Sequence, residues 1–475
     1  MAHDTSRQMT LIGFLQAQNC STYPGSWRHS GAMQDFMSPE YYQRIARTLE
    51  EGKFHLAFFD DRLAMPDIYG DDHAQTVEHG VRAVKMDPSP ILCAMAMATT
   101  HLGLGATYST TYYEPYHIAR HFATLDLMTK GRVAWNVVTS LNDSEAANFG
   151  REMHLEHDLR YDRADEFLET VMGHWDSWED DALILDKASG RFADPAKVHR
   201  LDHRGEYFKS RGPLTVPRSQ QGHPVLIQAG QSGRGRAFAS RWGELIFVVY
   251  PNLAAGKKQY AELKQAVSAA GRDPDKVKVS TACYTVVAES EEIAQQERDY
   301  IDSLAKPIDS LTLLCEVLNT DFSTRDYDAP FTDAEMKAIS GWTGFRDRVV
   351  MLSGKQNPSV RDFVDFSNRA RLNEFPVFAG TAKTVADQME QWFVEGGCDG
   401  FVISPTHVPG GYEDFVRQVV PELQRRGVFR KDYDGTTLRE NLGLAKPKAG
   451  DWREQAFAGV NDVNDAMGEP MRKAG

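Results

Sequence analysis

Eight short apolar segments, separated by helical patterns, constrain the fold more than any other feature of this sequence. Several of them are apolar at every position, which is typical of parallel strands covered on both faces. The expected strands are residues 9–14, 55–59, 104–109, 133–139, 224–229, 245–250, 277–287 and 400–405. Eight such strands with helices between them predict an α/β protein with a (β/α)8 barrel of the TIM type rather than an open sheet.

Two regions interrupt this alternation. Residues 179–219 are polar and follow an expected helix, and residues 303–374 lie between the seventh and eighth expected strands. Insertions that follow barrel strands build the rim of the active site. We therefore expect residues 1–444 to form one barrel domain with insertions at the carboxyl mouth, the second of them as a lid. Residues 445–475 are expected to form an extended tail.

Composition narrows the function classes. The formal net charge of −14 argues against binding to nucleic acid, which favours a basic stripe, and against anionic membranes. The five cysteines are scattered and form no C-x-x-C pair, which indicates reduced thiols. Residues 1–9 lack the apolar core of a signal peptide, and no apolar run is long enough to span a bilayer. We expect a cytoplasmic protein.

Amide, hydroxyl and carboxyl side chains gather where the expected strands end. The second strand runs into Asp60 and Asp61, the third contains Thr107 and the fourth contains Asn136. Such a lining suits a planar heterocycle with many hydrogen-bonding edges better than a metal ion. The two aspartates cannot act together as a glycosidase pair, because adjacent strand residues point to opposite faces.

A glycine-rich turn follows the fifth expected strand. Residues 230–235 include Ser232 and precede a helix, so their N–H groups and the hydroxyl can point at a phosphate. An ordinary strand-to-helix turn explains the same residues equally well. The nicotinamide fingerprint G-x-G-x-x-G is not found in the sequence.

Two further patterns admit other chemistry. His154 and His157 are three residues apart beside carboxylates, which is compatible with a metal site, although there is no H-E-x-x-H motif. We favour a cofactor contact from His157 and Tyr161 at the start of a helix, with capping and packing as the alternative. Cys20 has no identifiable base near it, so we interpret it as a buried or rim thiol.

The residues that carry a family resemblance cover most of the chain. They are 54–61 (FHLAFFDD), 102–120 (LGLGATYSTTYYEPYHIAR), 131–149 (GRVAWNVVTSLNDSEAANF), 157–169 (HDLRYDRADEFLE), 212–230 and 399–442. In these strings the chain resembles the nitrilotriacetate and dibenzothiophene-sulfone monooxygenase branch of the luciferase-like flavoproteins.

The resemblance implies a reduced FMN cofactor at the carboxyl mouth of the barrel and a separate NAD(P)H:FMN reductase that supplies it. It also implies a homodimer or homotetramer. One oxygen atom of O₂ would enter the substrate. The cofactor-binding residues that it implies are Asp61, Thr107, Asn136, His157, Tyr161 and Ser232.

The substrate pocket is expected to be apolar, with Phe14, Phe59 and Val377 on its wall. His117 is a candidate for proton transfer, with a core or strand-end histidine as the alternative. Thr22 stands where sulfone monooxygenases have a histidine, a departure from the family pattern. Because the expected wall is apolar, we expect an aromatic, organosulfur or chlorinated aromatic substrate. The alternative is an aminopolycarboxylate, which would need arginines or lysines that the sequence does not place in the pocket.

Two other functions are compatible with the sequence. A flavin or deazaflavin reductase uses the same barrel without inserting oxygen. A metal-dependent barrel hydrolase would use His154 and His157 with nearby carboxylates. Loss of activity with a chelator would favour the hydrolase.

Overall fold

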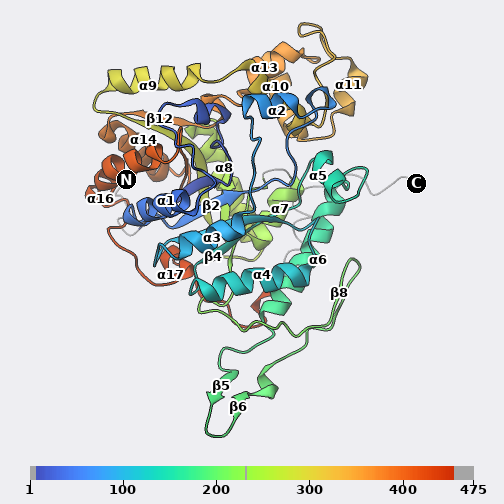
Figure 1. The fold of residues 1–475 in the computed structure, drawn as a ribbon, viewed down its shortest axis with the longest axis vertical. Coiled ribbons are helices and arrows are strands. Elements are labelled where there is room, and N and C mark those ends of the chain that lie inside the picture. The colour runs from blue at the N-terminus through green and yellow to red at the C-terminus, as the bar shows by residue number, and fades with distance from the viewer. Residues whose placement is uncertain (1–6, 231–232, 454–475) are drawn as a thin grey trace.

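Eight parallel strands close into a barrel in the computed structural model, which describes residues 7–230 and 233–453 (Figure 1). The order around the ring is β10-β9-β4-β3-β2-β1-β13-β11, and pairing of β10 with β11 closes it. The barrel strands are β1 (Thr10–Gln16), β2 (Leu56–Asp60), β3 (Gly103–Ser109), β4 (Val133–Val138), β9 (Val225–Gln228), β10 (Leu245–Val248), β11 (Lys278–Val287) and β13 (Gly400–Ser404). Each overlaps one expected strand, so the predicted barrel is confirmed.

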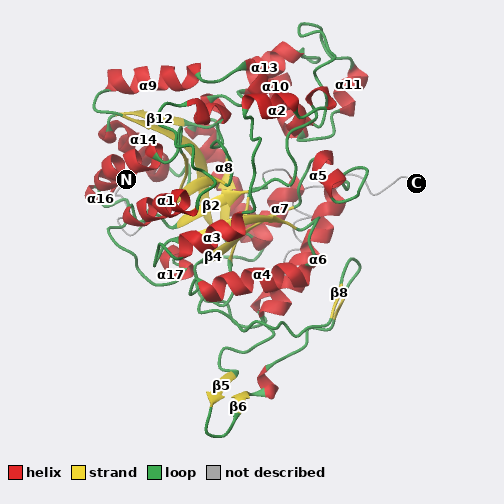
Figure 2. Ribbon diagram, viewed as in Figure 1, coloured by secondary structure: helices red, strands yellow, loops and turns green. Residues whose placement is uncertain are grey.

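Helices surround this barrel (Figure 2). They are α1 (Pro39–Glu51), α3 (Pro88–Ala96), α4 (Pro115–Met128), α6 (His157–Trp175), α7 (Gly233–Trp242), α8 (Leu253–Ala269), α14 (Ala382–Val394) and α16 (Val420–Arg425). In α1 the Ser38 side chain caps the first turn by accepting from the Tyr41 N–H, and Ile45 and Leu49 are buried against the barrel. No helix in the described ranges is long and apolar enough to cross a membrane.

The alternation of side chains along each strand separates two apolar cores. On β2, Leu56 and Phe58 fill the inside of the barrel, whereas Ala57 and Phe59 pack under the surrounding helices. The barrel interior is therefore a packed core, and a ligand is expected beyond the carboxyl ends of the strands.

The C-terminal region closes the amino end of the barrel. In α17 (Leu438–Leu442), Leu438 and Leu442 join the interior core, and the Leu438 N–H donates to the Gly131 carbonyl at 2.9 Å. Residues 445–453 continue over the surface, where Trp452 is buried in the outer core. Five of these nine residues are exposed, and the expectation of an extended tail over residues 445–475 stays a prediction. Residues 454–475 lie outside the described ranges.

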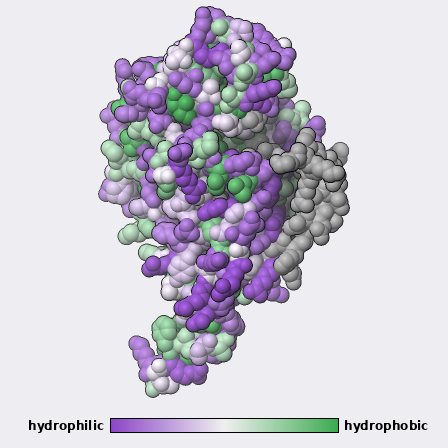
Figure 3. Space-filling view, turned by 90° about the vertical axis from the view of Figure 1, so that its right-hand side faces the viewer, coloured by the Kyte–Doolittle hydropathy of each residue, from purple (hydrophilic) through white to green (hydrophobic). Residues whose placement is uncertain are grey.

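The insertion at residues 179–219 lies at the end of the barrel opposite to the mouth. It contains β5 (Leu183–Asp186), β6 (Arg191–Ala193), β7 (His203–Arg204) and β8 (Lys209–Ser210), and the β5–β6 hairpin projects from the body (Figures 1 and 3). The expectation that this insertion borders the mouth was wrong. It follows α6, and a helix in a β/α unit returns the chain to the amino ends of the strands.

The second insertion does lie over the mouth (Figure 1). Its helices are α10 (Pro307–Leu318), α11 (Asp333–Ala338), α12 (Thr343–Ser353) and α13 (Val360–Ser367), and α2 (Ala74–His79) packs beside α10. Leu314, Phe322, Phe331 and Phe363 are part of a separate apolar core within it. The insertion is therefore a small, self-packed body rather than an irregular loop.

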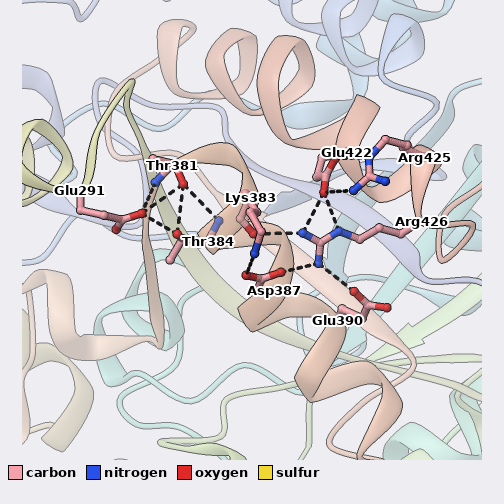
Figure 4. Close-up of polar contacts among 9 residues, drawn as sticks. All are labelled: Glu291, Thr381, Lys383, Thr384, Asp387, Glu390, Glu422, Arg425 and Arg426. Atoms are coloured by element: carbon pink, nitrogen blue, oxygen red, sulfur yellow. Dashed lines mark hydrogen bonds and ion pairs between the residues drawn. The ribbon is translucent and has the colours of Figure 1, made fainter.

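Polar contacts connect the elements on either side of this insertion. Glu291 of α9 (Glu291–Ser303) accepts from Thr381 and Thr384 at the start of α14, and Arg426 pairs with Asp387 further along α14 (Figure 4). The extra strand β12 (Val377–Gly380) pairs with the end of β11. These contacts fix the two ends of the insertion, where the chain leaves α9 and where it enters α14.

Candidate active site

The inner face of the mouth carries buried polar groups with unused hydrogen-bonding capacity. Thr107 and Asn136 are paired across β3 and β4, and the Asn136 amide nitrogen donates to the Thr107 hydroxyl at 2.9 Å. The Thr107 hydroxyl donates in turn to the Phe59 carbonyl at 2.9 Å. The Asn136 Oδ1 and both amide atoms of Gln16 are buried without a partner among the described residues. Buried polar atoms without partners are costly, so this face fits a ligand that has both donor and acceptor edges.

Asp60 and Asp61 occupy different surroundings at the end of β2. The Asp60 carboxylate accepts from the Lys85 ammonium at 2.6 Å. Burial favours a higher pKa for Asp60, but the charges of Lys85 and Arg82 outweigh it and lower the pKa. Asp61 lines a separate cavity of about 320 Å³. Burial raises the pKa of Asp61 to about 7, so its charge changes near neutral pH.

The third polar group lies where α6 and α7 begin. Tyr161 is buried, and its hydroxyl is hydrogen-bonded to the side chains of Thr139 and Gln228. Burial raises the pKa of this phenol, so it is a neutral hydrogen-bonding group at neutral pH. His157 is the first residue of α6, but its side chain and Ser232 lie outside the described residues.

His154, just before α6, carries unused hydrogen-bonding capacity. Burial lowers its pKa to about 4, so its ring is neutral, and neither ring nitrogen has a partner among the described residues. The Tyr112 ring lies 5.7 Å away, centroid to centroid, and its hydroxyl is also buried without a partner there. No group of three histidine, cysteine, aspartate or glutamate side chains within the described ranges is arranged to hold a metal ion.

An aromatic wall adjoins the polar mouth. Phe14 of β1 stacks on Phe58 with centroids 5.4 Å apart and faces Phe375 at 6.5 Å. Phe375 in turn stacks on Tyr284 of β11 at 5.1 Å. Phe375 was not found from the sequence, because it precedes β12 at the end of the long insertion and no periodic pattern marks it.

One residue prediction needs correction, and two stay predictions. Phe59 is buried outside the barrel, with its ring 5.9 Å from that of Tyr42 on α1, and Phe58 faces the interior in its place. His117 is exposed on α4, so it is not a core histidine. Its ring lies 6.4 Å, centroid to centroid, from that of Tyr113, which lines the cavity beside Asp61, and its part in proton transfer stays a prediction. Val377 begins β12 beside Tyr284, and its contact with substrate stays a prediction.

Hydroxyl groups and a buried thiol lie behind the aromatic wall. The Thr22 hydroxyl is hydrogen-bonded to the Tyr284 hydroxyl at 3.0 Å and also to the Ser404 hydroxyl. Cys20 is buried nearby, and burial raises its pKa to about 11. The thiol is therefore protonated and unreactive at neutral pH, in agreement with the interpretation from the sequence.

Buried ionic contacts hold the second insertion on the mouth. Glu316 of α10 accepts from Arg62 at 2.8 Å and from the Asn142 amide at 3.2 Å. Asp309 of the same helix accepts two hydrogen bonds from Arg28, at 2.6 and 2.9 Å. Sequence reasoning missed these pairs, because the partners are far apart along the chain and only the fold brings them together.

Comparisons with known proteins agree with this arrangement. Residues 14–400 match the family model of the luciferase-like monooxygenases. The chain is 49% identical over 450 residues to a dibenzothiophene-sulfone monooxygenase of Rhodococcus erythropolis, covering 93% of this chain and 98% of the relative. It is 40% identical to nitrilotriacetate monooxygenase component A of Aminobacter aminovorans, with coverage of 93% and 98%.

A solved structure supports the same assignment. A riboflavin lyase with modified FMN and riboflavin superimposes with a TM-score of 0.85 at 34% identity, covering 96% of this chain and all of that one. The closed barrel, its polar mouth and these likenesses lead to one conclusion: the chain belongs to the luciferase-like monooxygenases, a family of flavin-dependent oxidoreductases.

Proposed function

We propose that this protein is the oxygenating component of a two-component system in the cytoplasm. It takes reduced FMN from a separate NAD(P)H:FMN reductase and uses O₂ to oxygenate an aromatic, organosulfur or chlorinated aromatic compound. One observation carries the proposal: the unpartnered amide atoms of Gln16 and Asn136 lie on the same face of the mouth as the Phe14–Phe58 stack. This face offers hydrogen bonds to a heterocycle and an apolar surface to a substrate.

The cofactor contacts are assigned as follows. Asn136 and Thr107 hydrogen-bond to the polar edge of the flavin ring, and Asp61 lies at the rim beside it. The family resemblance implies that Tyr161, His157 and Ser232 contact the phosphate end of FMN. The start of α7 supports this, because the first turn of a helix presents free N–H groups to an anion.

Reduced FMN, when bound, supplies the electrons that activate O₂, so that one oxygen atom enters the substrate and the other leaves as water. The described residues position the reactants and exclude water. The second insertion covers the mouth through the Arg62–Glu316 pair, and the aromatic wall leaves little polar surface for water beside the substrate.

The relatives bear on the substrate. The name of the Rhodococcus enzyme specifies an organosulfur compound, which agrees with the aromatic wall made by Phe14, Phe58 and Phe375. The name of the Aminobacter enzyme specifies an aminopolycarboxylate, which stays the alternative. We also propose that the protein assembles as a homodimer or homotetramer, as the family resemblance implies.

The proposal is tested with an unrelated NADH:FMN reductase and ¹⁸O₂, on a panel of aromatic sulfones, chlorinated aromatics and aminopolycarboxylates. One labelled oxygen atom per product molecule is expected. Asn136→Ala is expected to weaken reduced-FMN binding about 10-fold, the value of one lost hydrogen bond to a buried partner. Asn373→Ala is the control, because Asn373 is exposed and bonded to Arg298. Failure of the wild-type protein to bind reduced FMN would refute the proposal.

A further inference from the structure

A small cavity at the mouth has an unbalanced set of charges. It lies between the end of β2 and α10, and charged side chains make up most of its lining. Three of them are cations and two are carboxylates: Arg62, Arg82, Lys85, Asp60 and Glu316. One positive charge is therefore left without a counterion within the cavity.

The unbalanced charge is that of Arg82. Lys85 pairs with Asp60 at 2.6 Å, and Arg62 pairs with Glu316 at 2.8 Å. Arg82 instead donates to the Thr22 carbonyl at 3.1 Å, and its Nε is buried without a partner in the described part of the chain. A partly buried guanidinium that lacks a carboxylate partner is costly unless a ligand provides one. Arg82 also lines the larger cavity beside Asp61, so ligands can reach it from there.

The backbone holds Arg82 in this position at a cost. Its φ of 56° lies in the left-handed region, which a residue with a side chain rarely adopts. The loop around it is fixed to the segment after β1. The Asn19 amide donates to the Gly80 carbonyl at 2.8 Å, and the Val84 N–H donates to the Asn19 Oδ1 at 3.2 Å. Strain that is maintained by surrounding contacts is a feature of functional positions.

Arg82 is also connected to the aromatic wall. It bonds to the Thr22 carbonyl, and the Thr22 hydroxyl bonds to that of Tyr284. The Tyr284 ring stacks on Phe375, which faces Phe14. Arg82 is therefore joined to the aromatic wall by a continuous set of contacts. The larger cavity that Arg82 lines also offers Met65, Met86 and the Tyr113 ring to a ligand, so an aromatic ring and an oxyanion group can be held there together.

We propose that Arg82 is a specificity-determining residue that binds a single oxyanion group on the substrate, a carboxylate or a sulfur oxyanion. The inference rests on the proposed function and narrows its substrate class. One negative charge balances the cavity, whereas a compound with three carboxylates leaves two charges unpaired. Arg82 also corrects the expectation that no cation is available in the pocket.

The test measures binding of benzoate, benzenesulfonate and neutral benzamide by calorimetry, with and without bound FMN. Wild-type protein is expected to bind one or both anions more tightly than benzamide, and the preferred anion identifies the carboxylate or the sulfur oxyanion. Arg82→Gln is expected to weaken anion binding about 10- to 100-fold, the range for a charged hydrogen-bonded contact, and to leave benzamide unchanged. Arg82→Lys keeps the charge and should recover part of the affinity.

The controls separate this inference from misfolding and from the proposed function. Both variants retain a side chain at the left-handed position, so their melting temperatures should equal that of the wild type. Arg361→Gln removes an exposed arginine and should change nothing. Anion affinity that is equal in the wild type and Arg82→Gln, or no greater than that for benzamide, would overturn the inference. A loss of FMN affinity alone would assign Arg82 to the cofactor. If the wild-type protein does not bind reduced FMN, the proposed function fails instead.

Discussion

Asp126 is a carboxylate whose replacement should stabilise the protein in a pH-dependent way. It is fully buried near the end of α4, and its Oδ1 accepts from the Val133 N–H at 3.0 Å and from the Gln221 amide at 2.7 Å. Its other oxygen accepts from the Ser219 hydroxyl. Burial raises its pKa from 3.8 to about 6, although these hydrogen bonds oppose the rise. The perturbation is Asp126→Asn.

The magnitude follows from this shift. About two pH units correspond to about 3 kcal/mol between the ionised and protonated forms. Because the pKa of Asp126 is higher in the folded state, folding is favoured when the group is protonated. Stability is therefore lost as the pH rises from about 4 to about 6. An asparagine has no charge to lose, and its amide nitrogen can donate to the Ser219 hydroxyl. Asp126→Asn should gain about 2–3 kcal/mol at pH 7.5 and almost nothing at pH 4.

Urea unfolding of wild type and variant at these two pH values measures the difference. Asp347→Asn is the control, because Asp347 is exposed beside Arg346, and it should show no pH-dependent gain. The reasoning is refuted if Asp126→Asn gains the same free energy at both pH values, or if it is less stable than the wild type at pH 7.5.

Three other predictions concern the mouth. The pKa of Asp61 is about 7, and its carboxylate accepts a hydrogen bond from FMN more strongly when it is ionised. The affinity of the protein for reduced FMN should therefore rise between about pH 6 and pH 8. Asp61→Asn should abolish this rise in a fluorescence titration, and a rise that persists would contradict the assignment. Phe58→Ala should cost about 3–5 kcal/mol in urea unfolding, because Phe58 packs against Phe247 inside the barrel, and a cost below 1 kcal/mol would contradict that placement. Glu316→Gln should speed proteolysis within residues 303–374, because it removes the counterion of Arg62, with an unchanged cleavage rate as the opposing result.

The barrel was predictable because buried parallel strands are apolar on both faces, so that β9 and β10 appear as unbroken apolar runs. The positions of the two insertions were not predictable in the same way. A polar segment indicates an insertion, but its polarity does not say at which end of the barrel the insertion lies. Residues 179–219 come after α6, the helix that has already returned the chain to the base, whereas residues 303–374 come before α14, the helix that returns the chain from the mouth to β13.

The site was predictable where a strand presents it. Thr107 and Asn136 lie on neighbouring strands and meet as expected. The choice of Phe59 over Phe58 failed because a shift of one residue reverses the face of a strand. Arg82 was missed because it is in a loop whose position depends on contacts with the segment after β1, and no periodic pattern encodes such contacts.

The closure of the barrel has a consequence for synthesis. Strand β1 lies between β2 and β13, with Thr10 opposite Gly400, and the amino end is filled by Leu438 and Leu442 of α17. A chain emerging from the ribosome therefore exposes an unpaired edge of its first strand until more than four hundred residues have been made. Chains that end before α17 would leave the apolar interior exposed at the amino end of the barrel. Premature termination should therefore yield aggregates rather than a smaller active enzyme.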